Sequence, residues 1–83
     1  MEITRARDLG AVLRHGRRQK GWTQQDLADK LGVTRQWVAS VELGAPTARV
    51  GLVIDALRWV DIVIETRTDD SQAILDRVPG LRP

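Results

Sequence analysis

The sequence predicts a mainly α-helical domain of four or more helices, followed by one C-terminal β-strand. Two observations support this fold class. Apolar residues recur at helical spacing through most of residues 5–58, with capping residues and glycines between the runs. A single β-branched run then occupies residues 60–66. A chain of 83 residues forms one domain with a small core, so dimerisation is an expected source of extra stability.

The first predicted helix covers residues 5–20, and Gly21 ends it. Arginines lie around most of its circumference, whereas apolar and small residues recur on one side. The residues expected on this buried stripe are Leu9, Val12, Leu13 and Gly16.

The second predicted helix begins at Thr23, a good N-cap, and Asp26 three residues later completes a capping box. Gly32 ends the helix because the turn needs a residue that tolerates positive φ. Ala28 is small at the point where this helix must approach the next one closely. The segment therefore predicts a short helix followed by a tight turn.

A third helix follows this turn, capped by Thr34. Val38 and Val41 share one of its faces and are expected in the core. Another face carries polar side chains that are free to meet a ligand, namely Arg35, Gln36 and Ser40.

The fourth predicted helix covers about residues 48–58, with Thr47 as its cap. Its expected core positions are Val50, Ile54 and Leu57. The helical domain and its strand together are expected to span residues 1–66, and residues 67–83 form a tail that is either flexible or docked on a partner.

Residues 60–66 predict the only strand of the chain. One strand cannot satisfy its own backbone hydrogen bonds, and an exposed apolar edge invites pairing. The same strand of a second copy would complete a two-stranded antiparallel ribbon across a two-fold axis. The dimerisation residues are then Ile62, Val63 and Ile64. The alternative is a C-terminal extension of the fourth helix, because short apolar runs suit either structure.

Charge and composition narrow the class of function. Residues 4–20 contain six basic residues and one acid, which suggests a polyanionic partner or, without a motif, a solvated helix face. The chain has no Cys, one His and no glycine-rich phosphate loop, so we expect no enzyme, no cofactor and no metal site. It also lacks a signal-peptide pattern and an apolar run of membrane-spanning length, which favours a cytoplasmic protein without membrane contact.

The register of Gln24, Ala28, Gly32 and Val38 resembles the phage-repressor helix-turn-helix domains of the Xre or Cro/cI family, over about residues 7–59. Residues 42–44, Glu-Leu-Gly, resemble the Glu-x-Gly that closes the third helix in this family. There the Glu commonly pairs with an Arg of the first helix. The resemblance therefore implies a structural ion pair between Arg17 and Glu42.

A helical domain followed by a strand narrows the resemblance to the HipB-type antitoxins. Those proteins are small homodimers that bind palindromic double-stranded DNA operators and neutralise a partner kinase, HipA. The resemblance thus implies a dimeric transcriptional repressor that is also the antitoxin of a HipA-like kinase toxin. The alternative is a stand-alone Xre-type regulator, such as a phage or restriction-modification controller, without a toxin partner.

The resemblance also implies which residues meet DNA. Gln24 matches a position that contacts a phosphate, and Thr34, Arg35 and Gln36 match base-reading positions. Arg35 suits guanine O6 and N7, or else a phosphate, and Gln36 suits adenine N6 and N7.

Two further positions of the third helix have open roles. Trp37 either contacts a thymine methyl or sugar, or covers the seam between the second and third helices. Ser40 lies one turn along and reaches the DNA backbone or a base.

Overall fold

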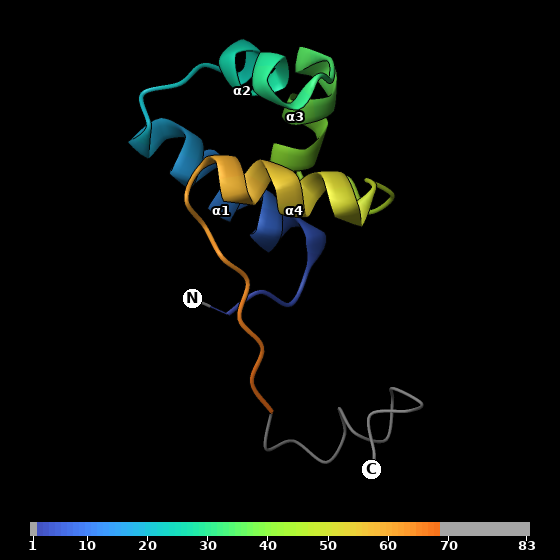
Figure 1. The fold of residues 1–83 in the computed structure, drawn as a ribbon. Helices are drawn as coiled ribbons and strands as arrows, with labels where there is room; N and C mark the ends of the chain where they lie inside the picture. Colours follow the sequence, from blue (N-terminus) through green and yellow to red (C-terminus); the bar gives the residue numbers. More distant parts are fainter. Residues whose placement is uncertain (1, 69–83) are drawn as a thin grey trace.

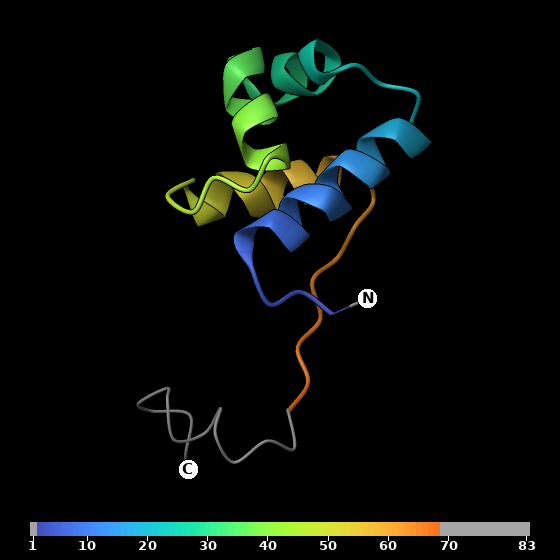
Figure 2. The same cartoon turned by 180° about the vertical axis from the view of Figure 1, so that it is seen from behind.

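The computed structural model describes residues 2–68, which contain four helices. They are α1 (Ala6–Gln19), α2 (Gln24–Leu31), α3 (Arg35–Glu42) and α4 (Val50–Trp59). Figures 1 and 2 show α2 and α3 together at one end of the molecule, above α1 and α4. The mainly helical fold and the bounds of the first three helices confirm the predictions to within a residue or two. The predicted tail lies outside the described residues from position 69 onward.

The core lies where the four helices meet, and each helix contributes to it. Ala28 of α2 is fully buried, as expected of a small side chain at a close approach between helices. Gly10 of α1 has a similar role, because a Cβ there would overlap the carbonyl oxygens of Val41 and Glu42. The buried hydrophobic residues are Leu13, Leu27, Ala28, Val38, Val41, Val53, Ala56, Leu57 and Val60.

The ends of α2 have the geometry that its sequence predicts. The Thr23 hydroxyl accepts from the Asp26 backbone N–H at 3.0 Å, and the Asp26 carboxylate accepts from the Thr23 backbone N–H at 2.8 Å. This backbone hydrogen bond holds the pKa of Asp26 below its usual value. Gly32 has a φ of 72° and turns the chain sharply toward α3.

The predictions for α4 were partly wrong. The helix begins at Val50 with Arg49 as its N-cap, whereas Thr47 lies in the preceding turn. Val50 is 69% exposed and Ile54 is 42% exposed, whereas Val53 and Leu57 are buried. The helix is apolar around much of its circumference, so two different faces satisfied the expected spacing and the sequence could not distinguish them.

Beyond α4 the chain turns and leaves the helical body (Figure 1). Asp61 has a φ of 63°, and the Ile62 N–H donates to the Leu57 carbonyl oxygen at 2.8 Å. Ile62 packs against the core of its own chain, whereas Val63 and Ile64 are exposed. Residues 2–68 contain no β-strand. The strand at residues 60–66 and its ribbon therefore remain predictions, because a strand needs a partner for its hydrogen bonds.

We expect Thr23→Ala to lower the free energy of unfolding by about 1 kcal/mol, because the Asp26 N–H loses its side-chain acceptor. Thr47→Ala is the matched control and should leave stability unchanged, since the Thr47 side chain is exposed and does not cap α4. Urea denaturation of the two variants measures the difference. Equal losses from both substitutions would contradict the assignment of the caps.

Candidate nucleic-acid interface

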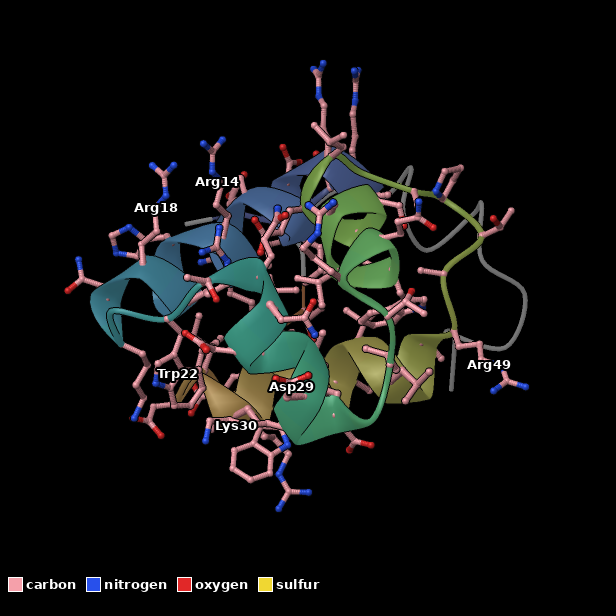
Figure 3. The ribbon with its side chains drawn as sticks, turned by 90° about the horizontal axis from the view of Figure 1, so that it is seen from above. Arg14, Arg18, Trp22, Asp29, Lys30 and Arg49 are labelled. Atoms are coloured by element: carbon pink, nitrogen blue, oxygen red, sulfur yellow. The ribbon has the colours of Figure 1, made fainter. Side chains whose placement is uncertain are left out.

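The first turn of α3 presents a row of polar side chains to solvent. Val38 and Val41 hold the opposite face of the helix in the core. Figure 3 looks down on α2 and α3 from the side that faces away from α1 and α4. The exposed residues of this surface are Thr34, Arg35, Gln36 and Ser40.

The N-terminus of α3 is electrostatically suited to an anion. The Thr34 hydroxyl accepts from the Trp37 N–H at 3.1 Å, which caps the helix, and the first turn contains no acidic residue. The first backbone N–H groups of a helix have no partners within it, and the helix dipole makes this end positive. A phosphate group placed there would be stabilised by both effects.

A buried ion pair fixes α3 to α1. Arg17 Nε donates to Glu42 Oε2 at 2.7 Å, and Arg17 Nη2 donates to Glu42 Oε1 at 2.9 Å. The third nitrogen, Nη1, donates to the Trp22 carbonyl oxygen at 2.7 Å. The hydrogen bonds to Glu42 raise the pKa of Arg17, so the guanidinium remains charged in spite of its burial. One arginine thereby joins α1, the end of α3 and the segment that leads into α2.

Gln24 links this buried pair to the exposed surface. Its Nε2 donates to Glu42 Oε1 at 3.3 Å, and its Oε1 accepts from Arg35 Nη1 at 3.5 Å. Sequence reasoning missed this link because Gln24 lies far from both partners along the chain. The expected contact of Gln24 with a phosphate remains a prediction.

Trp37 and Ser40 lie in contact along α3. Trp37 is half-buried and packs against the core. The Ser40 hydroxyl donates to the Trp37 carbonyl oxygen at 2.9 Å. Contacts of these two residues with DNA also remain predictions.

Exposed arginines flank this surface. Arg14 and Arg18 project outward from α1 at one side of the α2–α3 surface, and Arg49 projects at the other side (Figure 3). None of the three forms an ion pair with another residue between positions 2 and 68. Their free positive charges suit the two phosphate backbones that border a groove of duplex DNA.

No three potential metal ligands gather among residues 2–68. Within the same residues, no helix combines the length and the apolar character needed to cross a bilayer.

Residues 8–62 match the profile of the family described as Helix-turn-helix domain. The chain is also 33% identical to the "Uncharacterized HTH-type transcriptional regulator y4mF" of Sinorhizobium fredii (strain NBRC 101917 / NGR234) over 58 residues, which cover 70% of this chain and 76% of that protein. The chain therefore belongs to the helix-turn-helix family of transcriptional regulators.

Within this family, the fold is similar to that of HipB. The solved structures entitled "HipB-O4 20mer complex" and "Structure of HipA-HipB-O2-O3 complex" each contain a chain that superimposes with a TM-score of 0.72 and 22% sequence identity. The superposition covers 86% of this chain and 99% of each of those chains. A chain of the structure entitled "MDT Protein" superimposes with the same values.

We expect Glu42→Ala to lower the free energy of unfolding by about 3–5 kcal/mol, because Arg17 would be left charged and buried without its carboxylate. The double variant Arg17→Met/Glu42→Leu should be considerably more stable than the single variant, since no charge then stays buried. Denaturant unfolding monitored by circular dichroism compares the two. If the double variant were as unstable as the single variant, the loss of stability would come from lost packing and not from the unpaired buried charge.

Proposed function

We propose that the protein is a dimeric, sequence-specific DNA-binding repressor that acts in the cytoplasm. The observation that carries the proposal is the exposed first turn of α3, which combines free helix N–H groups, no acidic residue and flanking arginines. An α-helix presented in this way fits the major groove of duplex DNA. No catalytic chemistry is part of the proposal.

Each exposed residue of the α3 surface has a proposed role. Arg35 and Gln36 read base edges, and Gln24 binds a phosphate at the start of α2. Arg35 also has the alternative of a phosphate contact, which gives affinity without sequence preference. The remaining proposed contacts with the duplex come from Thr34, Trp37 and Ser40.

The proposed dimer forms through residues 60–66, which pair with the same segment of a second copy. The exposure of Val63 and Ile64 supports this role, because both are apolar and β-branched. Ile62 would contribute by holding the segment against its own helical domain. A two-fold dimer reads two half-sites of a palindrome, roughly 34 Å apart for each helical turn of DNA between them.

We further propose that the repressor is the antitoxin of a HipA-like kinase. The similarity of fold to HipB supports this proposal, since one of the similar structures is entitled a HipA–HipB complex. The alternative is a stand-alone regulator. The relative from Sinorhizobium fredii favours it, because that protein is named only as a transcriptional regulator.

A pull-down distinguishes these two functions. The tagged protein is captured from extract of its native cell, with nuclease present so that DNA does not bridge proteins. Recovery of a stoichiometric kinase-like partner would support the antitoxin function. Residues 67–83 of the present chain would then be the first segment to test for contact with that kinase. Recovery of the protein alone would favour the stand-alone regulator.

We expect Arg35→Ala to weaken binding to the selected operator by about 1–3 kcal/mol, which is roughly 5- to 150-fold. If Arg35 reads guanine, sequence preference at one base pair should relax as well. Fluorescence anisotropy with labelled operator duplexes measures both effects. Arg58→Ala is the charge-matched control, because it removes an exposed arginine from α4, outside the α2–α3 surface. Equal affinity of Arg35→Ala and the unmodified protein would argue against the proposed interface.

We expect the double variant Val63→Lys/Ile64→Lys to raise the dimer dissociation constant by about tenfold or more, because ammonium groups would be buried at the seam. The control is Glu65→Lys, which changes charge at an exposed polar position of the same segment. Sedimentation equilibrium measures the dissociation constant. An unchanged dissociation constant would indicate that the two-fold interface lies outside residues 63 and 64.

A further inference from the structure

A groove of about 660 Å³ opens between the C-terminal ends of α2 and α4. Its aromatic walls are the indole rings of Trp22, which precedes α2, and Trp59, the last residue of α4. Trp22 is half-buried and Trp59 is 46% exposed. No residue of α3 lines the groove, so it is separate from the proposed DNA-binding surface. Its volume is within the range of about 300–1,000 Å³ that holds small-molecule ligands.

Cations outnumber anions in this groove. Lys20 is paired with Asp61 at 2.5 Å, which leaves Lys30 and Arg58 against one remaining carboxylate, that of Asp55. Neither Lys30 nor Arg58 forms an ion pair with a residue between positions 2 and 68. The groove therefore favours an anionic ligand.

The Lys30 ammonium group lies over the two aromatic walls. Its Nζ is 4.7 Å from the ring centroid of Trp22 and 5.4 Å from that of Trp59. Figure 3 shows Lys30 and Trp22 close together at the edge of the domain. Because Lys30 is exposed on a flexible stem, it can turn from the rings toward an incoming carboxylate.

We propose that this groove binds a planar aromatic carboxylate as an effector. Once Lys30 has turned away, the indole faces that it covered stack on the ligand's ring, as aromatic pairs commonly do. The Arg58 guanidinium holds the carboxylate through two parallel hydrogen bonds, and Lys30 adds a third charged donor. A cationic ligand would be repelled by the surplus of positive charge. A neutral aromatic ring would leave Lys30 and Arg58 without a charged partner.

The hydrogen bonds of Trp22 connect the groove to α3. The Trp22 carbonyl oxygen accepts from Arg17, whose other nitrogens bind Glu42. Gln24 continues the connection from Glu42 to Arg35. A ligand that moves Trp22 thereby alters the position of Arg35 and changes the affinity for DNA. This second part of the proposal rests on the proposed DNA-binding function.

Binding is tested on the free protein by the indole N–H resonances of its three tryptophans in ¹H–¹⁵N correlation spectra. The probes are 2-naphthoate, neutral 2-naphthol and cationic 2-naphthylmethylammonium. Saturable shifts of the Trp22 and Trp59 signals by 2-naphthoate are expected, whereas Trp37 lies outside the groove and should stay unmoved. The other two probes should bind at least about tenfold more weakly.

Two groove variants and one control locate the site. Arg58→Ala and Trp59→Leu should each weaken 2-naphthoate binding by about tenfold, whereas Arg49→Ala removes an equal charge outside the groove and should not. Thermal unfolding verifies that each variant is folded. The proposal is overturned by the absence of saturable shifts, by tighter binding of the ammonium probe, or by binding that survives both groove substitutions.

The coupling is tested by the affinity for operator DNA with and without saturating 2-naphthoate. A change of about fivefold or more is expected, in either direction. An unchanged affinity would overturn the coupling but not the binding site. A protein that binds no operator at all would contradict the proposed function, and the spectra of the free protein would still decide the ligand site.

Discussion

The buried pair of Arg17 and Glu42 is the constraint on which the arrangement of the helices depends. Two charges removed from water are stable only when their hydrogen bonds are satisfied, and here the carboxylate and all three guanidinium nitrogens have partners. Those partners come from α1, from the end of α3 and from the segment before α2. The pair therefore ties α3 to α1 and to the segment before α2 through directional, charge-assisted hydrogen bonds.

The local features of the fold could be predicted from the sequence because their causes are local. Thr23 and Gly32 mark the ends of α2 through their own side chain and backbone freedom, so that their neighbours in sequence suffice. In α4 the decisive fact is which apolar face meets α1 and α2, and a helix that is apolar around much of its circumference does not contain that information. The proposed strand at residues 60–66 would need a second chain for its hydrogen bonds, so neither its presence nor its register follows from one copy.

The candidate site shows the same division. The exposed polar turn of α3 follows from periodicity, because burial of Val38 and Val41 determines which side chains face solvent. The bridge from Glu42 through Gln24 to Arg35 joins residues far apart in sequence, and the grouping of Trp22, Lys30 and Trp59 joins three separate segments. Contacts of this kind arise from tertiary packing, and no spacing rule identifies them.

The two faces of α3 are under different structural constraints. Val38 and Val41 are buried in the core, whereas the exposed side chains of Gln36 and Ser40 form no hydrogen bond to another helix among residues 2–68. Exposed positions that cap no helix, such as Gln36 and Ser40, tolerate exchange at little cost in folding, usually within about 0.5 kcal/mol. Related proteins can thus diverge at these positions while they keep a common scaffold. Arg35 is less free to diverge, because its neighbour Gln24 is shared with the buried ion pair.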